Sequence, residues 1–225
     1  STATIVVTDT VTGSAPTIDL DVSSDTGTSS TDNVTSDTTP TWNGSSDADA
    51  YIVLSIADGV STSVFTTTAT SGGTWTLTTT ALVAGSYTVS AVQVDSAGNT
   101  SVSSTATSIV IDDSTPSTPL AADLMSTSDT GTSPTDNVTY DDTPTFTGTA
   151  PSDHFVFLSV GNGSTTSVYT YTTTAGLNWY ITTNSLTDGT WTATVTHADT
   201  AGNVSSASTA TIVVTDTVTG SAPTI

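Results

Sequence analysis

The chain has 225 residues, 21 of them acidic, and neither Lys nor Arg, so its formal net charge is −21. A chain without basic side chains cannot neutralise phosphate groups, which excludes nucleic acids and anionic membrane surfaces as natural partners and leaves cations as the natural counterpart. Cysteine is absent, so disulfides and thiolate metal sites are excluded as well. The apolar runs are far shorter than the roughly 20 residues of a membrane-spanning helix, which argues against membrane insertion.

Every acidic residue is Asp, and Glu does not occur. Either acid would serve solubility, whereas Asp is the short side chain that tight turns and oxygen-rich cation sites use. The composition therefore favours turns, cation sites or both.

The chain repeats itself on two scales. Residues 24–35, SDTGTSSTDNVT, return at 128–139 with one substitution, in a register of 104 residues. Residues 1–18 return letter for letter at 208–225, which sets an outer period of 207 residues. Because a fixed period is the signature of repeat architectures, we expect a fragment of a longer tandem array. The predicted pieces are the last strand of a preceding module with a linker (1–15), module 1 (16–113), module 2 (114–217), and a linker with the start of the next module (218–225).

Short β-prone segments follow one another along each module, and no window shows a helical period. Asp58-Gly59 and Asn162-Gly163 are hairpin signals between two such segments. After a strand at 4–7, the predicted strands are 17–22, 39–44, 51–56, 64–70, 75–82, 87–91 and 105–111 in module 1, and 120–125, 143–148, 155–160, 168–174, 179–186, 191–195 and 209–215 in module 2.

About seven short strands per module, with turn signals every 8 to 12 residues, predict an all-β fold of tandem immunoglobulin-like β-sandwich modules. Trp75 and Trp179 are predicted core anchors. If the strands run up and down in succession, alternate connections lie at opposite ends of a module. The loop at 24–35 would then lie beside the linker that leaves the last strand, and the loops around Asp49 and Asp95 would lie at the other end.

The order of the motifs resembles a known family. SDTGTSSTDNVT, then TPTWNG, then GGTWTLTTTALVAGSYTVSAVQVDSAGN, then a terminal Asp and a linker Pro, resemble the bacterial immunoglobulin-like extender modules of giant repeats-in-toxin surface adhesins. The resemblance covers both modules, although this chain departs from the family in lacking basic residues and Glu and in repeating as a two-module unit. It implies a secreted fibre on the bacterial cell surface, in which calcium ions stiffen tandem modules between an anchor and a distal binding domain.

Calcium can also be argued from the residues. Stacking one module on the next would bring three acidic groups to the joint, namely the loop at 24–35 of one module, the linker, and the loops at the facing end of its neighbour. Calcium takes 6 to 8 oxygen ligands from carboxylates, amides, backbone carbonyls and water. The predicted ligands are Asp9, Asp25, Asp32, Asn33, Asp49, Asp95, Asn99, Asp112, Asp113, Asp129, Asp136, Asn137, Asp153, Asp199, Asn203 and Asp216.

The alternative for each loop is an ordinary turn. Asp, Asn and Gly form turns without any ligand, and Gly98 and Gly202 can supply a positive φ. Without an ion, the clustered carboxylates would repel one another and leave the linker flexible.

Enzymatic chemistry is not expected. His154 and His197 do not have metal-like spacing, and His197 replaces Gln93 as a filler on a strand. Asp pairs alone could suggest a glycosidase, but the carboxylates sit in turns that recur every 104 residues, whereas an enzyme needs one site.

The predicted function is therefore a structural spacer of an extracellular bacterial adhesin or surface filament, whose partners are neighbouring identical modules in the same chain. One alternative is a glycan- or surface-binding module, for which Tyr169, Tyr171 and Tyr180 are the candidate aromatic platform. Another is a self-assembling extracellular fibre subunit with lateral contacts between chains.

Overall fold

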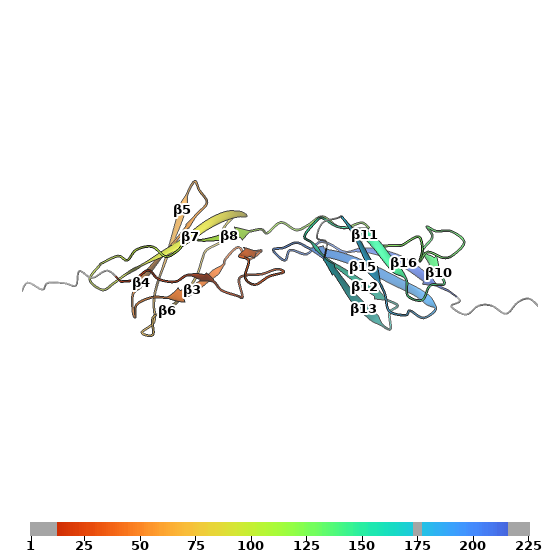
Figure 1. The fold of residues 1–225 in the computed structure, drawn as a ribbon, viewed down its shortest axis with the longest axis horizontal. Coiled ribbons are helices and arrows are strands. Elements are labelled where there is room, and N and C mark those ends of the chain that lie inside the picture. The colour runs from red at the N-terminus through yellow and green to blue at the C-terminus, as the bar shows by residue number, and fades with distance from the viewer. Residues whose placement is uncertain (1–12, 173–176, 216–225) are drawn as a thin grey trace, which may run out of the picture. The chain divides into compact units, whose positions relative to one another are not determined.

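The computed structural model describes residues 13–172 and 177–215, and the chain divides into two compact units, Ser1–Ser114 and Thr115–Ile225 (Figure 1). The predicted ligands Asp9 and Asp216, the predicted strand at 4–7, the end of the strand at 168–174 and the segment 218–225 lie outside the described residues.

Module 1 is built from eight described strands, all short and rich in Thr and Val. They are β1 (Asp19–Leu20), β2 (Val34–Thr35), β3 (Thr41–Ser45), β4 (Tyr51–Ala57), β5 (Thr62–Thr68), β6 (Thr74–Thr78), β7 (Gly85–Val94) and β8 (Thr107–Ile111). Among the described residues they form a three-stranded sheet, β1-β3-β6, and a five-stranded sheet, β2-β8-β7-β4-β5.

Module 2 repeats this arrangement in its described residues. Its strands are β9 (Asp123–Leu124), β10 (Val138–Thr139), β11 (Thr145–Thr149), β12 (Phe155–Gly161), β13 (Thr166–Thr172), β14 (Asn178–Thr182), β15 (Gly189–Ala198) and β16 (Ser208–Val214). The sheets are β14-β11-β9 and β10-β16-β15-β12-β13. The predicted all-β class with two immunoglobulin-like modules is confirmed.

The expected up-and-down succession of seven strands is wrong at the start of each module. The predicted strand at 17–22 contains only β1, which pairs antiparallel with β3 in one sheet. A further strand, β2, forms at the end of the segment predicted as a loop and pairs parallel with β8 in the other sheet. The signature loop, residues 21–33, is therefore a crossover between the sheets. Its Ser, Thr, Asp, Asn and Gly residues satisfy the backbone through side chains where no ladder is available.

The strand register places the acidic loops at opposite ends of a module. Gly85 pairs with Ile111, and β2 pairs with the last two residues of β8, so the signature loop lies where β8 ends. Tyr51 pairs with Val94, which brings the β3–β4 and β7–β8 connections together at the other end. Module 2 follows the same register.

Each core contains two buried aromatic residues from the three-stranded sheet. Trp42 and Trp75 are at most 2% exposed in module 1, and Phe146 and Trp179 at most 1% in module 2, so the predicted core role of the later Trp is confirmed. Gly148 packs directly against Trp179, because a Cβ at that position would lie 2.5 Å from Trp179 Cζ2. The alternation of buried and exposed residues along β4, β6 and β7 completes the core.

Candidate functional site

The signature loop is held in place by Ser24. Ser24 Oγ donates to Asp37 Oδ2 at 2.7 Å and accepts the Thr41 N–H at 2.9 Å, which ties the loop to the start of β3. The Ser24 and Asp25 N–H groups donate to the Asp21 carbonyl, and the Thr35 hydroxyl donates to the Ser24 carbonyl. Module 2 repeats the side-chain contacts with Ser128, Asp141, Thr145 and Thr139. Much of the repeated motif therefore forms the hydrogen bonds that hold the crossover between the two sheets in place.

In both modules the Asp that follows this Ser is buried, and only one of its two carboxylate oxygens accepts a hydrogen bond. Asp25 and Asp129 are only 5% and 3% exposed. Their Oδ2 atoms accept the N–H of Asn33 at 3.3 Å and of Asn137 at 3.2 Å. Both Oδ1 atoms are buried and have no hydrogen-bond partner. A buried carboxylate oxygen without a donor is costly, so its repetition in both modules calls for a compensating group.

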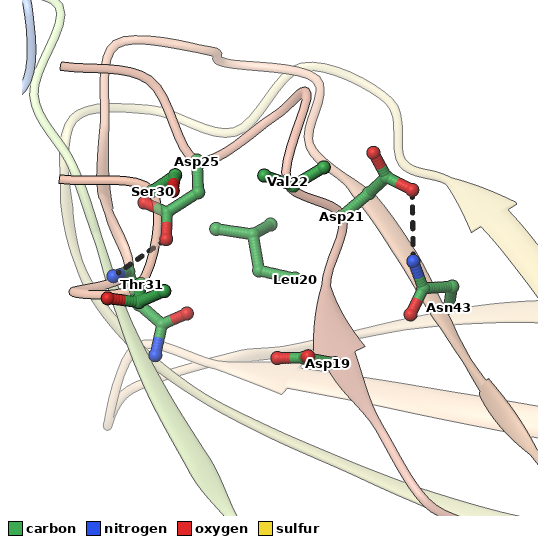
Figure 2. Close-up of a pocket in the computed structure, with 9 residues that line it drawn as sticks. Asp19, Leu20, Asp21, Val22, Asp25, Ser30, Thr31 and Asn43 are labelled. Atoms are coloured by element: carbon green, nitrogen blue, oxygen red, sulfur yellow. Dashed lines mark hydrogen bonds between the residues drawn. The ribbon is translucent and has the colours of Figure 1, made fainter.

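Asp25 lines a pocket of about 410 Å³ between β1 and the signature loop (Figure 2). Burial raises the pKa of Asp25 most, and the charges of Asp32 and Asp19 raise it further, against the lowering effect of the Asn33 N–H. The pocket is lined by Asp19, Leu20, Asp21, Val22, Asp25, Ser30, Thr31, Asn33 and Asn43. Its polar lining consists of carboxylate, amide and hydroxyl groups.

Asp21 is the half-buried carboxylate of this pocket, and both of its oxygens accept hydrogen bonds. Figure 2 shows it turned towards Asn43, whose Nδ2 donates to Asp21 Oδ2 at 2.9 Å. The Ser23 N–H and hydroxyl donate to Asp21 Oδ1 at 2.9 and 2.6 Å. These bonds, those from Ser23 first, lower the pKa of Asp21. Module 2 has Met125 and Thr147 in the places of Asp21 and Asn43, so the two modules share Asp25 and Asn33 but not this pair.

The opposite end of each module carries satisfied turns. Asp95 Oδ1 accepts the N–H groups of Ala97 and Asn99 at 2.8 and 2.9 Å, and Oδ2 accepts Asn99 Nδ2 at 2.7 Å. The bonds from Asn99 lower the pKa of Asp95 most. Asp199 and Asn203 repeat the turn. Within a module these side chains therefore stabilise the β7–β8 and β15–β16 turns.

The remaining predicted ligands are exposed or half-buried. Asp49 and Asp153 have φ values of 57° and 61°, as turn residues do. Asp32 and Asp136 accept the N–H groups two residues further on. Asp112 accepts the Ser114 N–H at 3.0 Å, and Asp113 is exposed. Within residues 13–172 and 177–215, no three His or Asp side chains are close enough to hold a metal ion by themselves. Any ion at one of these ends would need amide, hydroxyl, carbonyl or water ligands as well.

The three predicted aromatic ligands do not share a surface. Tyr169 packs against the core of module 2, and its hydroxyl accepts the Asn184 N–H at 3.0 Å. Tyr180 is 48% exposed between the buried Trp179 and Ile181, so it faces away from that core. Tyr171 is 36% exposed on β13, on the same strand face as Tyr169.

Sequence reasoning missed a contact between the two His residues. The Nδ1 atoms of His154 and His197 lie 2.7 Å apart, although 43 positions separate the residues in sequence. His197 is 2% exposed, and its Nε2 lies 2.9 Å from the Ser117 carbonyl oxygen. In module 1, Gln93 Nε2 donates to the Ser14 carbonyl at 2.6 Å, so His197 keeps that role of anchoring the entering linker. His154 immediately precedes β12 and His197 is the next-to-last residue of β15, and the pairing of Val156 with His197 brings them together.

Two sandwiches of a three-stranded and a five-stranded sheet, each with a first strand that switches sheets, define a tandem pair of immunoglobulin-like domains. The chain belongs to the bacterial Ig-like domain family, whose pattern it matches over residues 10–113 and again over 115–217. None of the curated proteins is similar enough in sequence to count as a match.

Several solved structures resemble the chain in fold. The FN1–FN3 domains of chicken CNTN1 are 12% identical with a TM-score of 0.52, and the match covers 91% of this chain and 67% of that one. A tetra-tandem repeat in the extending region of a large adhesion protein is 22% identical with a TM-score of 0.34, over 91% of this chain and 50% of that one. A 1.5-MDa bacterial ice-binding adhesin is 22% identical with a TM-score of 0.38, over 90% of this chain and 65% of that one. At these identities the likeness concerns the fold alone.

Proposed function

We propose that the chain is a structural spacer of an extracellular bacterial adhesin or surface filament, in which calcium at the intermodule joints stiffens the array. The observation that carries the proposal is the repetition of one bacterial Ig-like module with acidic loops at both of its ends and no basic residue anywhere. A module that contacts mainly its neighbours lengthens a rod by repetition. Among the described residues no helix could cross a membrane.

The acidic ends account for a dependence on an ion. Two carboxylates about 5 Å apart in water repel by roughly 1 kcal/mol, and by several times more where water is partly excluded. Several such pairs would separate successive modules. The unpartnered Oδ1 atoms of Asp25 and Asp129 indicate that this end of each module fits a cation. A shared divalent ion would cancel the repulsion and cross-link the loops.

The ligands that would serve a joint come from both of its sides. From the module before the joint they are Asp32 with the linker residues Asp112 and Asp113, and from the module after it they are Asp153, Asp199 and Asn203. Sites of this type in extracellular modules bind calcium with dissociation constants of about 10⁻⁴ to 10⁻³ M.

Small-angle X-ray scattering of the 225-residue chain tests the proposal. We expect the maximum dimension to be larger and the interdomain flexibility lower in 10 mM calcium than in excess chelator. Replacing both Asp112 and Asp113 with Asn should remove that difference, whereas the exposed turn variant Asp188→Asn should retain it. An unchanged maximum dimension in calcium and chelator would eliminate calcium as the cause of stiffness.

Lateral assembly is the second candidate function, and one observation favours it. β5 and β13 are edge strands of the five-stranded sheets, are seven residues long and contain neither Pro nor Lys. Such an edge can pair with a strand of another chain. Electron microscopy of the two-module chain would show bundles if this pairing operates, and single rods if the spacer acts alone.

A further inference from the structure

We propose that module 2 binds a divalent transition-metal ion of the zinc class between the Nδ1 atoms of His154 and His197. The site lies within module 2, so it is independent of calcium at the intermodule joints. Module 1 has Ala50 and Gln93 at the two positions and therefore lacks the site. The ion would fix the two imidazole rings and, through His197, the segment that enters the module at Ser117.

The two ring nitrogens converge on one point. His154 Nδ1 and His197 Nδ1 lie 2.7 Å apart, with the ring planes tilted by 42°. Two Zn–N bonds of about 2.0–2.1 Å at a tetrahedral angle would hold the nitrogens roughly 3.3 Å apart. His154 is half-buried and lies just before β12. Its side chain can therefore withdraw by the roughly 0.6 Å that the ion requires.

The ring of His197 is already oriented as a metal ligand. Its Nε2 lies 2.9 Å from the Ser117 carbonyl oxygen, which can only accept, so the proton of the neutral ring is on Nε2. The lone pair of Nδ1 then points at His154. A metal-binding His commonly donates its other N–H to a backbone carbonyl or a carboxylate, which fixes the tautomer and makes the ligating nitrogen more basic. β15 pairs with β12 and with β16, which holds the backbone of His197 in place.

His154 can supply the second nitrogen without a change of charge. In the hydrogen-bonded pair its Nδ1 carries the proton that His197 Nδ1 accepts. In the other tautomer of the neutral ring this proton is on Nε2, and exchange with water connects the two forms. Nδ1 of His154 then has a lone pair as well. The ion takes the place of the shared proton between the two rings.

The surroundings of the pair favour a cation. Burial first, and then the charge of His197, lower the pKa of His154, whereas the charges of Asp199 and Asp153 raise it. These two carboxylates are thus near enough to stabilise positive charge between the rings. The chain has no Lys or Arg that could repel the ion. Water would fill the remaining coordination positions, so the site is weaker than a structural zinc site with four protein ligands.

The ligand type separates this site from the calcium sites at the joints. Imidazole nitrogen suits zinc and copper, whereas calcium takes oxygen ligands. Calcium in excess should therefore compete at the acidic loops and leave the His pair open to zinc.

Isothermal titration of zinc into the 225-residue chain, in excess calcium, tests the proposal. We expect one zinc ion per chain. His154→Ala and His197→Gln should each lower the affinity at least about tenfold, since loss of an outer partner of a ligand alone costs about 10–100-fold. Both variants carry the residues of module 1, which the same strands accommodate. Asp188→Asn, an exposed residue of module 2, is the control and should keep the affinity.

NMR and thermal unfolding show where the ion binds. The ring signals of both His residues should shift and saturate at one equivalent of zinc and stay unchanged when calcium is added instead. Zinc should raise the unfolding midpoint of module 2 and leave that of module 1 unchanged, because only the native state of module 2 holds the ion.

Two results would overturn the proposal. One is the absence of saturable zinc binding in excess calcium, which would leave the His pair as a hydrogen bond only. The other is unchanged zinc affinity in the variant that combines His154→Ala with His197→Gln. The calcium response of the maximum dimension in scattering should be the same in this variant and in the unchanged chain, so the zinc site and the calcium joints can fail separately.

Discussion

The Nδ1 atoms of His154 and His197 face each other at 2.7 Å, with ring centroids 4.8 Å apart. His197 Nε2 lies against a carbonyl oxygen, which can only accept, so this nitrogen carries a proton. In the neutral ring, His197 Nδ1 is then the acceptor and His154 Nδ1 the donor. The pair holds one proton between its two nitrogens, and a second proton would set two N–H groups against each other.

Module 2 should therefore lose stability in mild acid. Burial first, and then the charge of His197, lower the pKa of His154 below 6.5, while the charges of Asp199 and Asp153 oppose the shift. The unfolded chain binds a proton at higher pH than the folded one, so this contribution to stability is complete above pH 6.5 and falls as the pH drops towards the folded pKa. The chain has only two His residues, so the ring signals of His154 can be identified in NMR and followed as the pH changes.

Module 1 supplies the matched control, because it has Ala50 and Gln93 at the two positions. The variant His154→Ala with His197→Gln should unfold with a midpoint that changes less between pH 7.5 and pH 5 than that of the unchanged chain. Equal pH dependence in the two proteins would contradict a role for the His pair.

The fold was predictable because the repeat and the strand alternation are properties of local sequence. The hairpin at Asp58-Gly59 formed as expected, with Gly59 at a φ of 88° and the Asp58 N–H bonded to the Ser61 carbonyl. The additional strand β2 was not predictable, since the parallel pairing of Val34 with Val110 is a contact between distant segments. A two-residue strand leaves no periodicity to recognise.

The sequence predicted which residues the candidate site contains, but not which of them are buried without a partner. Asp25 and Asp95 were expected to act alike, but burial leaves one carboxylate oxygen of Asp25 unpartnered while Asn99 satisfies Asp95. Burial is a property of the tertiary structure and is not visible in a loop sequence of Ser, Thr, Asp and Asn. The contact of His154 with His197 was missed for the same reason.

Replacing Gly148 with Ala should destabilise module 2 by about 1–3 kcal/mol, because overpacking forces neighbouring groups to move. The added Cβ would lie 2.5 Å from Trp179 Cζ2 and 2.7 Å from Cε2, and the ring is fully enclosed. Urea unfolding followed by Trp fluorescence measures the loss. Gly72→Ala is the control, since its nearest contact is the Thr70 hydroxyl at 3.7 Å, and it should change the free energy of unfolding by less than about 0.5 kcal/mol.

In each module, a large aromatic side chain near the start of β7 or β15 donates a hydrogen bond to a backbone carbonyl four residues earlier. Tyr87 Oη donates to the Val83 carbonyl at 2.8 Å, and Trp191 Nε1 donates to the Thr187 carbonyl at 2.9 Å. Tyr87→Phe keeps the ring and removes the bond, so we expect a loss of about 1 kcal/mol in the free energy of unfolding. Tyr51→Phe, at a 46% exposed ring, is the control. A loss of equal size in the control would show that the carbonyl contact contributes nothing specific.

Ser24→Ala should lower the free energy of unfolding of module 1 by more than the loss of a single hydrogen bond would, because it weakens the crossover from β1 to β2. The Ser24 hydroxyl both donates to Asp37 and accepts from the Thr41 N–H, so its removal leaves a backbone donor at the start of β3 without a partner. An unsatisfied buried donor costs about 1–3 kcal/mol. Ser128→Ala should have the same effect in module 2, where Ser128 contacts Asp141 and Thr145.

Chemical denaturation of both variants, with the exposed Ser71→Ala as control, measures these losses. Hydrogen exchange should show faster exchange at the Thr41 or Thr145 amide in the module that carries the change and unchanged exchange in the other module. Because Ser24 adjoins Asp25, the same variant should also weaken calcium binding at that loop if the loop holds an ion. A Ser24→Ala chain with native stability would mean that the repeated Ser-Asp pair is not what holds the crossover in place.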